Sequence, residues 1–137
     1  MGYESRIYVV EKNENYKPYV DKDYYYGSVV AMFDLCGMAS SGQFLRLVDA
    51  SRPTDTAIHV DGKLVVNDPY GEPLKEMTIV DVISSLEDEA ATSDYRRLGP
   101  VIGLLRGFNE AQWQWTYKDE HGNMKSKPSL CVLHYGY

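Results

Sequence analysis

The sequence lacks the segments that place a protein in or across a membrane. Its longest uninterrupted apolar stretches are far too short to cross a bilayer. The first residues contain a carboxylate, Glu4, and no basic stretch followed by an apolar core, so we expect no signal peptide. These absences predict a cytoplasmic protein that does not bind membranes.

Cysteine is scarce as well. The two cysteines, Cys36 and Cys131, lie in apolar runs, where a free thiol behaves as a small apolar side chain. A metal site that combines them with His134 is disfavoured, because Cys131 and His134 are three residues apart in an expected strand and point to opposite faces. We therefore expect neither a metal nor another cofactor, and a reducing compartment.

Basic side chains are outnumbered, and catalytic motifs are missing. Fourteen Lys and Arg against twenty Asp and Glu give a net charge of −6, which disfavours direct contact with nucleic-acid phosphates. Ser40-Ser41-Gly42 lacks the strand and helix that flank a hydrolase serine. Gly99-Pro100-Val101-Ile102-Gly103 lacks the Lys and Ser or Thr of a phosphate loop. The sequence thus favours a protein that is not an enzyme.

What the sequence does contain is typical of one globular domain. Its 137 residues are 44% apolar and 25% charged, close to ordinary globular usage. A chain of this length buries about two thirds of the surface that its unfolded form exposes. No repeat or linker interrupts it, so we expect one compact domain over residues 1–137.

Three apolar segments from opposite ends of the chain predict a central sheet. Ser5–Glu11 is rich in β-branched and aromatic residues, as is the terminal run Leu130–Tyr137. Tyr24–Cys36 is either a strand or a short helix, and its length and β-branching favour a strand. We expect the three segments to pair with one another. Lys12–Asp23, between the first two, is typical of a loop that carries aromatic residues.

A hairpin and two helices follow from local patterns. Asp61-Gly62 suits a two-residue turn between Thr56–Val60 and Lys63–Asn67, with Val60 opposite Lys63 and His59 opposite Leu64. Thr78 is the expected N-cap of a helix that runs to about Ala90. The next helix is predicted from Tyr95, Leu98, Ile102 and Leu105. Gly99-Pro100 either delays its start or kinks it, Gly107 is the expected stop, and Asn109 is a candidate cap for one further turn.

The remaining segments complete the expected fold. Gly37–Ala50 is irregular, with one or two amphipathic turns. Trp113, Trp115 and Tyr117 alternate with polar residues, as in a half-buried strand. The sequence therefore predicts an α+β fold in which a mostly antiparallel sheet of about five or six strands is packed by two helices.

Several strings in the chain resemble a known group of proteins. They are Gly2–Lys12, Ala31–Cys36, Tyr70–Glu76, Asp94–Arg97 and Val132–Tyr137. In these strings the chain resembles small uncharacterised proteins encoded by phages and prophages of Gram-positive bacteria. Most of those proteins join the Gln112-Trp113 region to the last strand more directly, so Thr116–Ser129 is expected to be an extra hairpin. The resemblance implies a phage gene product acting in bacterial cytoplasm, where small acidic proteins often inhibit host enzymes or defence systems by binding.

Tyrosine supplies the best binding candidates, with twelve residues against three phenylalanines. Five of them are interleaved with Glu14, Asp21 and Asp23: Tyr16, Tyr19, Tyr24, Tyr25 and Tyr26. Tyrosine offers a large contact area and a hydroxyl at a low cost in conformational entropy, which suits it to interfaces. Coverage of a sheet edge explains these residues equally well.

Asp34 and His134 are the other candidate site residues. Asp34 follows five apolar residues, and burying its charge without a partner would cost several kcal/mol, so we expect it to reach solvent or pair with Arg6 or His134. An aspartate and histidine pair is able to transfer protons. A structural ion pair is the stronger interpretation of the two.

Three functions remain open at this level. The first is a non-enzymatic phage accessory protein, a monomer or homodimer, that binds and inhibits or modulates a host protein in an anti-defence or host-takeover role. The second is a module that binds or sequesters a small molecule or nucleotide, with Trp113, Trp115, Tyr117 and Asp34 lining its pocket. The third is a small enzyme that uses Asp34 and His134.

Overall fold

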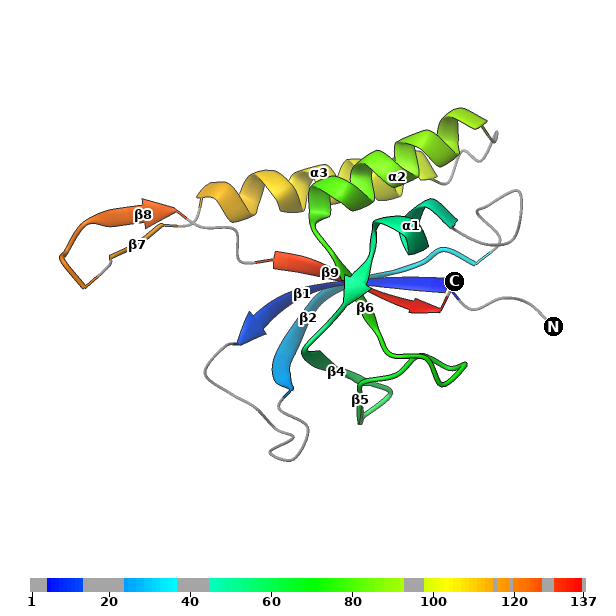
Figure 1. The fold of residues 1–137 in the computed structure, drawn as a ribbon. Helices are drawn as coiled ribbons and strands as arrows, with labels where there is room; N and C mark the ends of the chain where they lie inside the picture. Colours follow the sequence, from blue (N-terminus) through cyan, green and yellow to red (C-terminus); the bar gives the residue numbers. More distant parts are fainter. Residues whose placement is uncertain are drawn as a thin grey trace.

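The computed structural model describes residues 5–13, 24–36, 45–92, 98–114, 116–118, 120–126 and 130–136. The strands, in chain order, are β1 Ser5–Asn13, β2 Tyr25–Asp34, β3 Arg52–Pro53, β4 Thr56–Val60, β5 Lys63–Val65, β6 Lys75–Met77, β7 Thr116–Lys118, β8 Met124–Ser126 and β9 Leu130–Gly136. The helices are α1 Leu45–Ala50, α2 Ile79–Thr92 and α3 Leu98–Gln114. Helices and sheet pack together, so the predicted α+β class is confirmed (Figure 1).

The three apolar segments form the centre of the main sheet, as predicted. The strand order is β3-β6-β9-β1-β2-β4-β5, so the first and last strands, β1 and β9, lie side by side in the middle. β1 pairs antiparallel with β2 and with β9. The alternative of a helix in Tyr24–Cys36 is wrong, because this segment packs along the whole length of β1 and its β-branched residues suit a strand.

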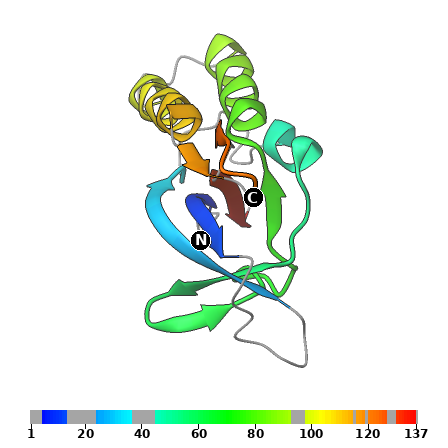
Figure 2. The same cartoon turned by 90° about the vertical axis from the view of Figure 1, so that its left-hand side faces the viewer.

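The sheet is larger than predicted and curled. Seven of the described strands form it, instead of five or six, because β3 and β6 are too short to show a period in the sequence. It is mixed, since β2 and β4 pair in parallel through Tyr25 with Thr56 and Tyr26 with Ala57. Figure 2 shows the sheet curving around, with the β4–β5 hairpin on the side opposite to α2 and α3.

The β4–β5 hairpin confirms the predicted turn and register, but β5 ends at Val65 and not at the predicted Asn67. Asp61 has a φ of 52° and Gly62 one of 79°, as a two-residue hairpin turn requires. Val60 pairs with Lys63 and His59 with Leu64, the predicted register. β7 and β8 form a separate two-stranded sheet beyond the end of α3, so a hairpin lies within Thr116–Ser129 as predicted (Figure 1).

The structure confirms the predicted start of α2, decides between the two alternatives for the start of α3, and corrects the predicted end of α3. Thr78 caps α2, since its Oγ1 accepts the Asp81 backbone N–H at 3.1 Å. Pro100 lies in the first turn of α3, where its missing N–H has no partner to lose, so it marks the start and does not kink the helix. The stop at Gly107 and the cap at Asn109 are wrong, because α3 continues to Gln114.

Tertiary contacts explain why α3 passes through Gly107. Leu105 and Phe108 pack into the core, on either side of the glycine. Gln112 is buried, and its Oε1 accepts the Leu130 backbone N–H of β9 at 3.1 Å, so the last turns are fastened to the sheet. The predicted strand over Trp113–Tyr117 is also corrected. Trp113 belongs to α3, and the strand in this region spans Thr116–Lys118.

Two buried clusters lie on the two faces of the sheet. The larger one, between the sheet and the helices, contains Ile7, Val9 and Val132 with residues of α1, α2 and α3. The smaller one contains Tyr8, Val10, Ile58, Val60, Leu74 and Leu133 under the β4–β5 hairpin. Alternation along β1 and β9 therefore sends successive side chains into different clusters. A third helix, α1, joins the two that were predicted, and Arg46 of α1 pairs with Glu89 of α2 at 3.1 Å.

Gly27 marks the point where β2 crosses closest to β4. A Cβ there would lie 2.7 Å from Thr56 Cγ2 and 3.1 Å from Ile58 Cγ2, and both of these side chains are fully buried. By contrast, a Cβ at Gly103, in the middle of α3, would meet open space. The same substitution therefore has opposite consequences at the two positions.

We expect Gly27→Ala to lower the free energy of unfolding by about 1–3 kcal/mol through overpacking. Gly103→Ala should raise it by about 0.5–1 kcal/mol, because alanine favours the helix that glycine weakens. Denaturant unfolding of both variants measures the two changes against the wild type. A Gly27→Ala variant as stable as Gly103→Ala would contradict the close approach of β2 and β4.

Candidate functional site

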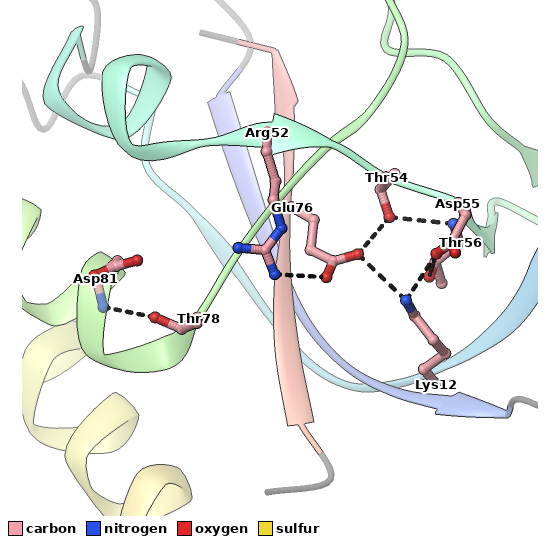
Figure 3. Close-up of polar contacts among 8 residues, drawn as sticks. All are labelled: Lys12, Arg52, Thr54, Asp55, Thr56, Glu76, Thr78 and Asp81. Carbon is pink, nitrogen blue, oxygen red and sulfur yellow. Dashed lines mark hydrogen bonds and ion pairs between the residues drawn. The ribbon is translucent and has the colours of Figure 1, made fainter.

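A polar cleft lies where β1, β3, β4 and β6 come together. It has a volume of about 480 Å³ and is lined by Lys12, Arg52, Pro53, Thr54, Asp55 and Glu76. The residues come from β1, from β3 and the turn that follows it, and from β6. Apart from β3 and the turn that follows it, these segments are far apart in the sequence. The cleft therefore forms only when the sheet folds. Figure 3 shows its polar contacts.

Glu76 organises the cleft. Its side chain is only 11% exposed, although it is a carboxylate. Thr54 Oγ1 donates to Glu76 Oε1 at 2.7 Å, Lys12 Nζ lies 3.5 Å from the same oxygen, and Arg52 Nη2 lies 3.2 Å from Oε2 (Figure 3). A buried charge requires such partners. They hold the surrounding side chains in one arrangement.

A second carboxylate, Asp55, completes the network. Lys12 Nζ lies 2.7 Å from Asp55 Oδ1, and the Thr54 hydroxyl accepts the Thr56 backbone N–H at 3.1 Å. Burial works to raise the pKa of Asp55, but the hydrogen bond and charge of Lys12 outweigh it, so this pKa lies below its ordinary value of 3.8. Burial works to lower the pKa of Lys12, but Asp55 and Glu76 outweigh it and raise this pKa above 10.5.

These two shifts predict how stability changes with pH. The Asp55 contribution is complete above the pKa of the unfolded chain and is lost as pH falls through the lower folded value. The Lys12 contribution is complete below the unfolded pKa and is lost as pH rises through the higher folded value. The ion pair therefore stabilises the protein fully near neutral pH.

We expect the stability difference between wild type and Asp55→Asn to shrink as the pH falls below about 4, where Asp55 loses its charge. Denaturant unfolding from neutral to acidic pH measures this difference directly. In a Lys12→Met background, Asp55→Asn should leave the acidic part of the curve unchanged, because the partner is already gone. A difference that is constant with pH would contradict the assigned role of this pair.

Three of the predicted tyrosines lie in described residues at the start of β2, and Tyr25 contacts the cleft. Tyr24, Tyr25 and Tyr26 are each half-buried. The Tyr25 backbone N–H donates to the Asp55 carbonyl at 2.7 Å, and Lys12 Nζ lies 5.8 Å from the centre of the Tyr25 ring. Tyr26 faces the hairpin, with its hydroxyl 3.2 Å from His59 Nδ1. The other predicted tyrosines, Tyr16 and Tyr19, lie outside the described residues.

Asp34 and His134 do not come together. Arg6 pairs in register with both Asp34 and Tyr135, so these three residues share one face of the sheet. His134 pairs with Ile7 and therefore points to the opposite face. The predicted pairing of Asp34 with His134 is wrong for this reason. Asp34 is exposed, and its Oδ1 accepts the Cys36 backbone N–H at 2.9 Å.

His134 is instead a buried partner of Ser5. Its Nε2 lies 3.1 Å from Ser5 Oγ, and both residues are almost completely buried on the face toward the helices. A serine and histidine at this distance resemble a nucleophile with its base. Burial withholds them from a substrate, however, so the contact is suited to joining β1 to β9.

Cys131 lies near the cleft but is not reactive. Burial, with the charge of Glu76 adding to it, raises the pKa of the Cys131 thiol to about 12. Because the thiolate is the reactive form, a thiol with this pKa is almost inert at neutral pH. Cys131 pairs with Val10 and His134 with Ile7, so they face different clusters, as the metal argument required. Over the described ranges, no group of three or more His, Cys, Asp or Glu is placed to hold a metal ion.

Sequence reasoning missed the cleft and placed its candidate pocket elsewhere. The expected pocket at Trp113, Trp115 and Tyr117 involves side chains outside the described part of the chain. The local sequence gives the cleft little signal, since Glu76 follows another charge, Lys75, between the apolar Leu74 and Met77. Such a charge in a short strand needs partners, but the sequence does not show which ones.

Further findings concern the membrane and known proteins. Among the helices that the structure describes, none is long and apolar enough to span a membrane. Comparison of the chain with protein-family models, with curated proteins and with solved structures finds no match.

Proposed function

We propose that the chain is a phage-encoded accessory protein that binds and inhibits or modulates a host protein in the bacterial cytoplasm, without enzymatic activity. The resemblance of its strings to phage proteins supports the setting. The observation that carries the binding role is the cleft around Glu76 with the half-buried Tyr25 at its side, followed by Tyr26 on the same strand.

The physical character of this surface suits protein binding. Arginine and tyrosine are enriched among the residues that dominate interface energies. The ion pairs of Lys12 and Arg52 hold the cleft in one form before a partner arrives, so less entropy is lost on binding. The cleft carries both charge signs, which favours a partner that inserts a polar side chain between Arg52 and Asp55.

The test is capture of a host protein by the tagged chain from a bacterial lysate, repeated with variants. We expect Arg52→Ala and Tyr25→Ala to weaken retention of the captured protein by about tenfold or more. Arg106→Ala on α3 and Tyr70→Ala on the turn before β6 are matched controls, because neither residue lines the cleft, and they should retain it fully.

Two results would overturn this proposal. The first is that no host protein is retained in stoichiometric amount. The second is that the cleft variants and the controls retain it equally. Thermal unfolding of each variant must first show that the fold is intact, because Tyr25 also pairs with β4.

A small ligand is the second candidate, and the volume of the cleft favours it. About 480 Å³ falls within the range of small-molecule sites. Arg52 would donate hydrogen bonds to a negative group of the ligand, and Asp55 would accept them from a positive one. Screening amino acids and nucleotides for a rise in melting temperature tests this candidate. A rise that persists in Arg52→Ala would exclude the cleft as its site.

A further inference from the structure

The outer edge of β2 has no partner among the described strands over its second half. β2 pairs with β4 only through Tyr25 and Tyr26, after which the two strands diverge. From Ser28 to Asp34, none of the described strands pairs with this side of β2. An open edge presents unpaired backbone N–H and C=O groups to any extended chain that reaches it.

The same edge carries exposed apolar side chains. Val30 and Met32 are each 48% exposed and Val29 is 40% exposed. Val9 pairs with Ala31 and Val10 with Val29, so Val30 is an extra residue that bulges from the strand. A bulge of this kind sets two residues opposite one, which brings Val29 and Val30 together. Val29 and Met32 lie opposite Val10 and Tyr8, so the patch extends the smaller buried cluster to the surface.

The edge lacks the usual protection against pairing. Natural edge strands carry lysine, proline or inward charges that prevent association. Ser28–Phe33 contains none of these, and the bulge is the single protective feature. Exposed apolar residues without such protection mark a surface that is covered in use.

We propose that the edge of β2 binds the same edge of a second copy of the chain, so that two sheets join through antiparallel β2 strands. The segment is complementary to itself. Pairing about Ala31 sets Val30 of each copy opposite Met32 of the other, so these exposed apolar side chains meet on one face of the joined sheet. No like charges face each other, which a symmetric interface requires.

The salt dependence of this association is opposite to that of an interface held by ion pairs. Each copy carries a net charge of −6, so two copies repel one another at low ionic strength. The proposed contact is apolar and made by backbone groups, which salt does not weaken. Added salt should therefore tighten the dimer.

Sedimentation velocity from low micromolar to near-millimolar concentration tests the proposal. A reductant must be present, so that the exposed Cys36 does not cross-link the copies. We expect a concentration-dependent dimer that Val30→Lys and Met32→Lys each weaken by about tenfold or more, since each introduces like charges at the shared edge. Val80→Lys is the matched control, because Val80 is 56% exposed on α2 and should leave the dimer unchanged.

A second measurement separates strand pairing from contact through another part of this face. Backbone amides of residues 28–34 should exchange with solvent more slowly in the dimer than in the Val30→Lys monomer. A wild-type chain that stays monomeric at all concentrations would overturn the proposal. So would a dimer that is indifferent to both lysine variants or that shows no change in amide exchange. This interface does not include the cleft, so failure of one proposal does not affect the other.

Discussion

Leu105→Ala should lower the free energy of unfolding by about 2–5 kcal/mol, the range for removing a buried leucine side chain and leaving a cavity. Leu105 lies in α3 and is completely buried. It belongs to the larger cluster, where side chains from α1, α2, α3 and the sheet meet. Denaturant unfolding at neutral pH measures this loss.

Leu104 provides a control on the same helix. It is the neighbouring residue, and its side chain is 57% exposed. Leu104→Ala should change the free energy of unfolding by no more than about 0.5 kcal/mol, because no cavity forms. Equal losses in the two variants would show that α3 is rotated from the orientation described for it.

Removing both cations beside Glu76 should destabilise the protein by about 3–5 kcal/mol, because it leaves a buried carboxylate without a compensating charge. The variant is Lys12→Met with Arg52→Met. Glu76 would keep only the hydroxyl of Thr54 as a partner within the network, at 2.7 Å. The loss of the Asp55 pair contributes little, since Asp55 is 55% exposed and water solvates its charge.

Adding Glu76→Met to that double variant should restore most of the lost stability. An apolar side chain fills the space without a charge to solvate, so a replaced network is often as stable as the original one. Denaturant unfolding measures the free energy of unfolding of the double and the triple variant, and the difference between them tests this expectation. A triple variant less stable than the double would show that Glu76 stabilises the fold by itself, and not through its partners.

Features that depend on neighbouring residues were readable in the sequence. Asp61 and Gly62 tolerate the positive φ of a hairpin turn, and the register of β4 and β5 follows from the turn. Thr78 caps α2 through an N–H only three residues away. The central pairing of β1 with β2 and β9 was also predictable, because these are the longest apolar segments at the two ends of the chain.

Features that depend on distant residues were not readable. The helix α3 continues past Gly107 because Gln112 contacts β9. This contact outweighs the free-energy cost of a glycine inside a helix. The short strand β6 contributes Glu76 to the cleft but has too few residues to show a period. The separation of Asp34 from His134 follows from one step of register, which moves a side chain to the other face of a sheet.

The sequence by itself determined the α+β class, the β4–β5 turn, the start of α2 and the central position of the first and last strands. These depend on backbone preferences and apolar patterns that extend over a few neighbouring residues. Only the tertiary structure decided the curl of the sheet, the cleft around Glu76 and the open edge of β2. Each of those arises where strands far apart in the sequence meet or diverge, and no local pattern records which strands do so.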